Sequence, residues 1–277
     1  MKRGGMKRAA ATGVCVIVSV LFLYPYAWMI SGAFRDTADL LAAPLRLWPA
    51  HPSLDGFRAI AAAGGITLLR ATLNSLGITI ASAVLAVLAS VLGAYAVVRR
   101  PHAPALRVLR GLFLLAIMYP AMLLVIPVYI VVYKLGLLGG YLGIVLFLAL
   151  GPVQFFLFEQ FFRDMPASVL EAAAIDGANE WQVLFRVVVP IARPVMVTVA
   201  IISFLLNWSQ WFPVLVISST PDTYTLPVML LAQNGELGAN FQATMALAVV
   251  ITVPPALLFL FAQRRVVGGM TEGAVKG

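Results

Sequence analysis

The residues with the clearest chemical potential are amides and indoles near the end of an apolar run. Asn207, Trp208, Gln210 and Trp211 fall within five consecutive positions, which we call the 207–211 cluster. Sugars are bound in proteins by amide hydrogen bonds and by stacking on aromatic rings, so this cluster is a candidate for contacting a sugar. The same side chains could instead join helices by hydrogen bonds or anchor the chain at a membrane surface. The sequence leaves all three interpretations open.

Catalytic chemistry is not indicated by the rest of the chain. The sequence contains no GxxxxGK[ST] phosphate-binding loop, no GxSxG nucleophile motif and no HExxH metal motif. His51 and His102 stand far apart, without Cys or carboxylates at ligand spacing. We therefore expect no catalytic residue, no metal site and no cofactor bound by this chain. Glu159 is the deepest acidic residue in any apolar run, and the lack of a mid-membrane acid disfavours a proton-coupled carrier.

Composition places the chain in a membrane. Of its 277 residues, 62% are hydrophobic and only 11% are charged, against roughly 25% charged in soluble domains. The net charge of +8 is typical of basic cytoplasmic loops in a membrane protein, and we do not expect nucleic acid as a partner. The one cysteine, Cys15, cannot form an internal disulfide, and its place in an apolar run predicts a small buried side chain.

Apolar runs predict six transmembrane helices, since each crossing takes about 20 residues. Prolines within a run are compatible with this, because neighbouring helices can bond the freed carbonyls. The predicted fold class is an all-α integral membrane protein, with a transmembrane domain over residues 9–262. The six runs cover residues 9–34, 71–98, 111–133, 139–162, 194–217 and 241–262.

Charge distribution predicts the orientation. With a cytoplasmic N-terminus, fourteen Lys and Arg residues fall in inner segments, and both termini, residues 1–8 and 263–277, are cytoplasmic. Residues 35–70 are predicted to form an outer loop or short surface helices. The five outer basic residues are Arg35, Arg46, Arg58, Arg70 and Lys134.

Residues 163–193, between the fourth and fifth spans, form what we call the connecting segment. Pro166 can open a short helix and Gly177 can close it in a left-handed conformation. Asn179 can cap a second helix, with Gln182 completing a capping box. The predicted result is a helix–turn–helix on the cytoplasmic face, although a solvated amphipathic loop also fits the composition.

The sequence also predicts how the second helix is anchored and where it ends. Leu184 and Phe185 are expected to fasten it to the membrane domain. Pro190 and Pro194 are expected to end it and to redirect the chain into the fifth span.

These residues resemble a known motif. Glu171-Ala172-Ala173, Asp176-Gly177-Ala178, Phe185, Pro190 and Pro194 resemble the EAA loop of ATP-binding-cassette importer permeases. The resemblance covers most of the chain. Within the family, the chain resembles the carbohydrate-uptake branch, and within that branch the second permease subunit of maltose-type systems. Further matching stretches are Asn74-Ser75-Leu76, Pro120, Ile126-Pro127-Val128-Tyr129, Leu135-Gly136-Leu137 and the tail from Gln263 to Gly277.

The chain departs from the family pattern at two places. Gly139-Gly140 stands where the family usually has Asn-Thr. The run from Asn207 to Pro213 stands where the family tends to show Trp-Asn-Glu followed by an aromatic residue.

The resemblance implies a permease subunit that forms half of the translocation pathway for a sugar or related polyol derivative. It implies a coupling helix in a groove of the ATPase, and it implies that ATP-driven closure of the ATPases moves this helix and turns the pathway from inward- to outward-facing. The residues implied in the ATPase contact are Glu171, Ala172, Ala173, Asp176, Gly177, Ala178, Phe185 and Pro190.

The implied partners are a second, homologous permease, two ATPase subunits that bind ATP and Mg, and an extracytoplasmic substrate-binding protein, in a prokaryotic inner membrane. The loop at 218–240 would reach the binding protein by resemblance, or would be a plain solvated loop. A stand-alone secondary carrier and a membrane scaffold are the alternatives, and no inverted repeat supports the carrier.

Overall fold

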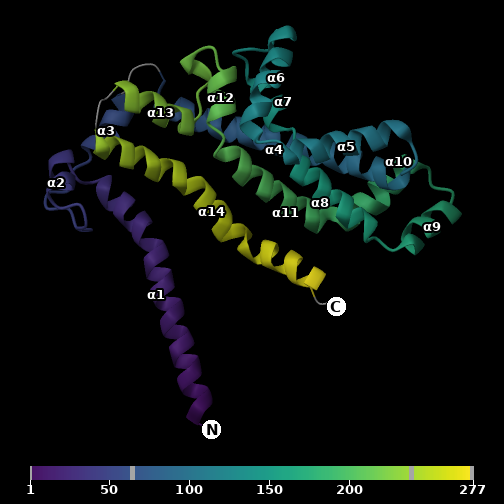
Figure 1. Ribbon diagram of the computed structural model, residues 1–277, viewed down its shortest axis with the longest axis horizontal. Helices are drawn as coiled ribbons and strands as arrows, with labels where there is room; N and C mark the ends of the chain where they lie inside the picture. Colours follow the sequence, from purple (N-terminus) through teal and green to yellow (C-terminus); the bar gives the residue numbers. More distant parts are fainter. Residues whose placement is uncertain (1, 63–65, 237–239, 275–277) are drawn as a thin grey trace. The chain divides into compact units, whose positions relative to one another are not determined.

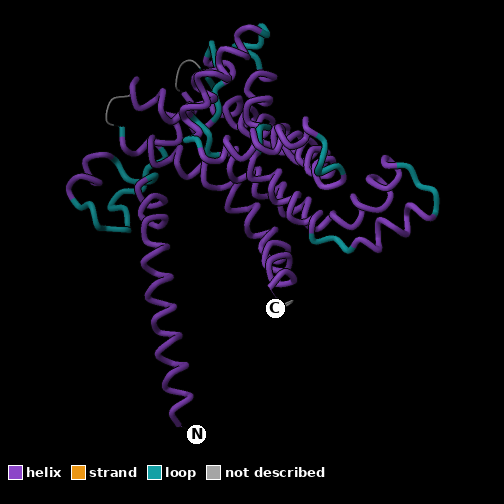
Figure 2. Tube along the Cα trace, turned by 45° about the vertical axis from the view of Figure 1, so that its right-hand side comes forward, coloured by secondary structure: helices purple, strands orange, loops and turns teal. Residues whose placement is uncertain are grey.

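The computed structural model describes residues 2–62, 66–236 and 240–274. Within these ranges every regular element is a helix (Figure 2). The chain divides into two compact units, one made of residues 1–68 and 229–254 and the other of residues 69–228 and 255–277.

The first unit is built around the loop that follows the first helix. Arg35, whose side chain is fully buried, donates hydrogen bonds to the carbonyls of Asp39, Ala43 and Arg46 and to the Asp39 carboxylate. The bond from the Arg35 guanidinium lowers the pKa of Asp39.

The expected short surface helices are confirmed within residues 35–70. The helices that begin in this unit are α1 (Lys2–Gly32), α2 (Thr37–Ala42), α3 (Asp55–Ala62) and α14 (Phe241–Ala274), which continues into the second unit.

Helix α1 packs little against its own chain. Residues 11–32 are long and apolar enough to cross a membrane, and the tested window has no buried residue. Cys15 is exposed, so the expectation of a buried thiol is wrong. The reason is that a span can satisfy its apolar surface with lipid or another subunit instead of with its own core.

The second unit contains most of the helices (Figure 1). Helix α8 packs against both α5 and α11, and α12 packs against α6 and α7. The elements are α4 (Leu68–Arg99), α5 (Pro104–Met118), α6 (Ala121–Lys134), α7 (Tyr141–Leu148), α8 (Pro152–Arg163), α9 (Ala167–Ile175), α10 (Glu180–Gln182), the π-helix η1 (Val183–Val188), α11 (Val189–Trp208), α12 (Phe212–Ile217), the 3-10 helix η2 (Pro221–Thr223) and α13 (Leu226–Glu236), which continues into the first unit.

Four helical stretches are long and apolar enough to span a membrane among the described residues, and a bent pair, Tyr141–Leu148 with Pro152–Arg163, would make a fifth. The two members of that pair meet at 45°. The other four stretches are Ala11–Gly32, Leu68–Arg99, Glu180–Trp208 and Phe241–Gln263.

The predicted third span, residues 111–133, is divided between α5 and α6. Tyr119 adopts an extended conformation (φ −85°, ψ 137°) because the following Pro120 disfavours a helical residue before it. Pro127, by contrast, lies inside the continuous helix α6. Only one of the two prolines therefore interrupts the helix, and neither half reaches the length of a span by itself.

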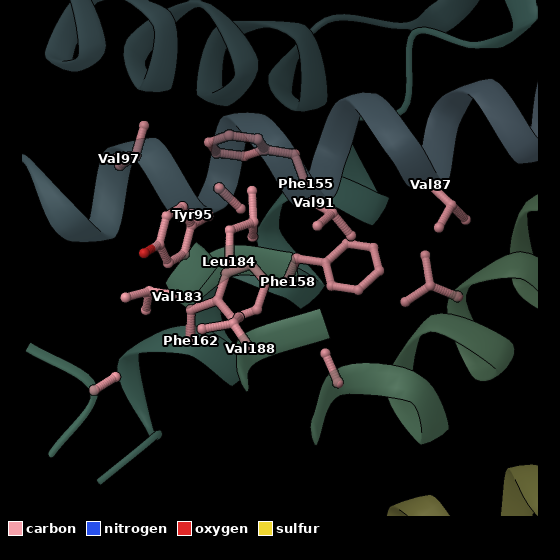
Figure 3. Packing of buried hydrophobic residues seen from close by; sticks show 14 residues of the cluster. Val87, Val91, Tyr95, Val97, Phe155, Phe158, Phe162, Val183, Leu184 and Val188 are labelled. Carbon is pink, nitrogen blue, oxygen red and sulfur yellow. The ribbon is translucent and has the colours of Figure 1, made fainter. Parts of the chain in front are cut away.

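An aromatic core holds the second unit together near the connecting segment. Figure 3 shows Phe158 and Phe162 of α8 gathered with Leu184 beneath Tyr95 of α4. Tyr95 meets Phe162 edge to face with ring centroids 6.1 Å apart. Phe155, on the same face of α8 as Phe162, stacks on Phe113 of α5 with ring centroids 4.4 Å apart. This core fastens α8 to α4, to α5 and to the start of the long helix that ends at Trp208.

Candidate functional site

The first half of the connecting segment forms the predicted short helix. Pro166 precedes α9, and Gly177 follows it with φ +73°, as predicted. The amide of Gly177 donates to the carbonyl of Ala174, and that of Ala178 donates to the carbonyl of Ala173, which is a Schellman motif. Because this motif requires a left-handed residue, the glycine sets the direction in which the chain leaves α9.

The second half begins with the predicted capping box. The Asn179 side chain accepts a hydrogen bond from the amide of Gln182 at 2.9 Å, and the Gln182 side chain accepts one from the amide of Asn179 at 2.9 Å. Two backbone donors at the helix start are thereby satisfied, which fixes where the helix begins.

The prediction that Pro190 and Pro194 end this helix is wrong. The helix runs without a break from Glu180 to Trp208, with Pro190 in the first turn of α11 and Pro194 inside it. The π-helix η1 explains this, because its wider turns, in which the Val189 amide donates to the Leu184 carbonyl, relieve the clash between the Pro190 ring and the preceding turn.

Burial divides the connecting segment into an inner and an outer side. Ala173 and Leu184 are 8% and 2% exposed and belong to the aromatic core, so the predicted anchoring role of Leu184 is confirmed. Phe185 is 57% exposed and stacks on Trp181, so its predicted anchoring role is wrong. Val183 and Leu184 both face this core, and the next side chain around the helix, Phe185, is turned away from it.

The outer side carries most of the residues that the EAA resemblance singled out. Glu171, Ala172, Asp176 and Gly177 are exposed. Ala178 is partly buried and packs on the core together with Ala173. The exposed face therefore combines two carboxylates with small side chains that another backbone can approach closely.

An ion pair, which the sequence did not indicate, ties the connecting segment to α4. The Glu180 carboxylate accepts hydrogen bonds from the Tyr95 hydroxyl at 2.9 Å and from Arg99 Nη2 at 2.8 Å. The partners are more than 80 residues apart in sequence. In the sequence, the only hint is that Arg99 directly follows a predicted span and Glu180 begins a predicted helix. That hint does not identify the two residues as partners.

The 207–211 cluster lies at the other end of the same helix. Helix α11 ends at Trp208, and residues 209–211 lead into α12. These residues border a cavity of about 490 Å³, otherwise lined mainly by apolar side chains of residues 109–152. Asn207, Gln210 and Trp211 line it, whereas Trp208 does not.

The four predicted residues of the cluster therefore differ in their surroundings. The Asn207 amide donates to Ser82 Oγ at 2.9 Å and to the Leu148 carbonyl at 3.2 Å, which joins three helices. Trp208 is 4% exposed and stacks on Phe204. Gln210 is partly buried and Trp211 is 38% exposed at the cavity. The helix-joining interpretation fits Asn207, and the ligand-contact interpretation fits Gln210 and Trp211. Trp208 is a buried packing residue of α11.

A second buried amide, Asn74, holds the segment after α12. Its Nδ2 donates to the carbonyls of Asp222 and Tyr224, and its oxygen accepts from the Tyr141 hydroxyl at 2.9 Å. Arg70 forms an ion pair with Asp222 at 2.7 Å. Residues 218–240 are thus not a plain loop, because they contain η2 and α13, whose backbone this amide and the Ser75 hydroxyl satisfy.

Gly139, at the first departure from the family pattern, occupies a position that favours glycine. Its φ is +74°, and an added Cβ would lie 2.9 Å from Ser219 Oγ. Asn also adopts this conformation, but in this chain its Cβ would meet the Ser219 side chain, so glycine fits better here.

Across the described residues, no group of three or more His, Cys, Asp or Glu side chains is placed to hold a metal ion. The arrangement offers a contact surface on the connecting segment and a cavity at the far end of the long helix.

Comparisons with known proteins agree with this arrangement. A family model described as "Binding-protein-dependent transport system inner membrane component" matches residues 86–272. The trehalose transport system permease protein SugB of Mycobacterium tuberculosis (strain CDC 1551 / Oshkosh) is 32% identical over 280 residues, with 99% of this chain and 100% of the relative covered. The diacetylchitobiose uptake system permease protein NgcG of Streptomyces coelicolor (strain ATCC BAA-471 / A3(2) / M145) is 29% identical over 97% of this chain and 89% of its own length.

A solved structure has the same fold. A chain of a bacterial ABC transporter involved in the import of the acidic polysaccharide alginate superposes with a TM-score of 0.80 at 21% sequence identity, over 95% of this chain and 98% of that chain. The family match covers well over half of the sequence, and it describes an inner membrane component of a binding-protein-dependent transport system. The chain therefore belongs to the binding-protein-dependent transport system inner membrane components, the permease subunits of ABC importers.

Proposed function

We propose that this permease carries a sugar or a related polyol derivative and forms half of its translocation pathway. The relatives named for trehalose and for diacetylchitobiose support a carbohydrate substrate. The cavity beside the 207–211 cluster supports it independently, since Gln210 offers an amide and Trp211 an indole at its wall.

The observation that carries the mechanism is one uninterrupted helix. It begins at Glu180 in the connecting segment and ends at Trp208 beside the cavity, a length of about 43 Å at 1.5 Å per residue. A displacement of its first turn is transmitted along a rigid element to residues that line the cavity. ATP-driven movement at one end can therefore open and close the pathway at the other.

The exposed face of α9 is the proposed contact with the ATPase. Glu171, Ala172, Asp176 and Gly177 reach the partner, and the exposed Phe185 lies on the same segment. Ala173 and Ala178 support this face from below because they pack on the core. Pro190 acts indirectly, since it lies directly after the π-turns.

The proposed topology has six spans with both termini cytoplasmic. Helices α5 and α6 form the third span with a break at Pro120, and α7 and α8 form the fourth. The excess of basic residues at the predicted inner ends supports the orientation. The cytoplasmic N-terminus covers residues 1–8, the membrane domain 9–262 and the tail 263–277.

The proposed complex contains a second permease, two ATPase subunits and an extracytoplasmic binding protein. ATP and Mg are held by the ATPases. The family description names a binding protein, which supports that partner.

A pull-down of the tagged chain from its native membranes in mild detergent tests the proposal, with ATP hydrolysis measured against a panel of sugars. We expect an ATPase in the eluate and stimulation by at least one sugar. Gly177→Val should lower stimulated hydrolysis roughly tenfold, since a left-handed conformation strains a side-chain-bearing residue by about 1–2 kcal/mol. No atom lies within 4 Å of the Cβ position, so the effect is conformational.

Gly177→Asn is the matched control, because Asn adopts the left-handed conformation more readily. It should keep most of the hydrolysis at equal expression. Full hydrolysis and uptake by the Gly177→Val variant would contradict the coupling role. A purified, folded chain that recovers no ATPase would contradict the importer complex itself.

A further inference from the structure

The second unit contains a small basic pocket that none of the roles above uses. Its volume is about 220 Å³. Drug-sized ligands occupy pockets of about 300–1,000 Å³, so this one suits a small anionic group and not a whole nucleotide. It is lined by Val97, Pro101, Leu106, Arg107, Arg110 and Arg163.

Two of the three arginines share a single carboxylate. Arg110 Nε and Arg163 Nη2 both donate to Oε1 of Glu159, at 2.7 and 2.6 Å, and Glu159 is buried beneath them. The Arg107 side chain is exposed and forms no ion pair or hydrogen bond with any residue that the structure describes. Three guanidiniums beside one carboxylate leave an excess of positive charge at the pocket.

Two of these guanidiniums are held in place before any ligand binds. Arg110 also lies over the ring of Phe156, with its Cζ 5.9 Å from the centroid. Because the Glu159 oxygen fixes both side chains, little rotamer entropy remains to be lost on binding. Guanidinium groups bind phosphate oxygens through paired N–H donors, so a phosphate group is the ligand that this chemistry favours.

Helix α5 adds an apolar stripe beside the charge. Leu114 and Met118 follow Arg107 at seven and eleven positions, which places all three on one helix face. Leu114 is 41% exposed and Met118 is 80% exposed. The stripe extends about 16 Å from Arg107, close to half of a hydrocarbon core about 30 Å thick.

We infer that this pocket binds the phosphate of an anionic phospholipid in the cytoplasmic leaflet, with an acyl chain lying along Leu114 and Met118. The leaflet assignment rests on the proposed topology, which places this end of α4 on the cytoplasmic side. Basic pockets between membrane helices on that side are suited to anionic head groups. Free phosphate offers the same charge chemistry, but it has no acyl chain to cover the stripe.

The test is a titration of the purified full chain, with whatever subunits accompany it, followed by native mass spectrometry. The probes are phosphatidylglycerol, phosphatidylcholine of the same acyl chains, and inorganic phosphate. We expect phosphatidylglycerol to bind preferentially. Arg107→Gln should weaken that binding about fivefold, which is the effect of one basic residue near an anionic surface. This arginine has no partner to lose among the described residues, so the variant should fold.

Arg193→Gln is the control, because it removes an exposed arginine from α11 outside the pocket. It should leave phosphatidylglycerol binding unchanged within twofold. Equal binding of the two lipids, or equal losses in the two variants, would overturn the inference. Binding of inorganic phosphate that depends on Arg107, without a lipid preference, would assign the pocket to a free anion. The titration uses neither ATP nor sugar, so its failure is distinguishable from failure of the proposed transport function.

Discussion

At each end of the helix from Glu180 to Trp208, one large side chain is buried and a nearby one is exposed. At the first end, Leu184 is buried in the aromatic core while its neighbour Phe185 lies on the surface. At the other end, Trp208 is buried while Trp211 lies at the cavity. Each end thus assigns anchoring and outward contact to different side chains. Mutation can therefore separate the stability of the helix from the contacts it presents.

The largest expected difference is between the two tryptophans. Trp208→Ala should reduce the free energy of unfolding by about 3–5 kcal/mol, because it empties a packed site. Trp211→Ala should destabilise the protein clearly less, because the Trp211 ring is already 38% exposed at the cavity. It should instead raise the KM for the transported sugar by up to roughly tenfold through loss of stacking.

Unfolding in mixed detergent micelles and uptake into proteoliposomes would measure the two quantities. If Trp211→Ala unfolded the protein as readily as Trp208→Ala, the division of roles at this end would be lost.

Leu184 and Phe185, at the first end, should show the same division between stability and outward contact. Leu184→Ala should cost about 2–5 kcal/mol of stability, and Phe185→Ala about 0.5 kcal/mol or less. Phe185→Ala should instead weaken recovery of the ATPase in the pull-down, because its ring is exposed on the proposed contact segment. A stable complex that retains its ATPase without the Phe185 ring would restrict the contact to α9.

A smaller effect is expected from the amide that joins α11 to α4. Asn207 and Ser82 should show a coupling energy of about 0.6 kcal/mol, with an upper bound of about 1.7 kcal/mol for such bonds in membranes. A double-mutant cycle of Asn207→Ala and Ser82→Ala on unfolding in detergent measures it. A coupling near zero, with a large effect of Asn207→Ala on sugar affinity, would move Asn207 from helix joining to substrate contact.

The smallest effect belongs to the ion pair at the first end. Arg99 and Glu180 are 31% and 48% exposed, so Glu180→Gln should cost about 0.2–1 kcal/mol. The loss should shrink as salt is added, because screening weakens the wild-type pair. Thermal unfolding of both proteins at low and high salt would check this, and a cost independent of salt would assign the effect to the Tyr95 hydrogen bond.

The sequence predicted the connecting segment best where backbone chemistry decides the structure. A left-handed turn at Gly177 and a capping box at Asn179 depend on residues within a few positions of each other, so both were predicted and found. The sequence could not show which of Leu184 and Phe185 is buried, because that depends on the side of the helix on which the core lies. Their burial follows from α4 and α8, which are remote in sequence.

The breaks in the membrane helices show the same limit. Pro120 and Pro127 are both embedded in apolar sequence, and only the first interrupts the helix. Whether a proline breaks a span depends on how neighbouring elements satisfy the freed carbonyls, which short-range patterns do not contain. For the same reason, the sequence identified a chemically interesting cluster at 207–211 without separating Trp208 in the core from Trp211 at the cavity.

The π-turns before Pro190 also show where the long helix can hold an extra residue without changing what lies beyond it. A π-turn holds one residue more than an α-turn, so it is a local insertion that the helix has absorbed. Because the wider turns take up that residue, the helix beyond Val189 keeps nearly the direction in which its side chains would point without it. An insertion within the ordinary α-turns of α11 would instead turn everything after it by about 100° about the helix axis. Asn207 would then face away from Ser82, and a different set of side chains would border the cavity.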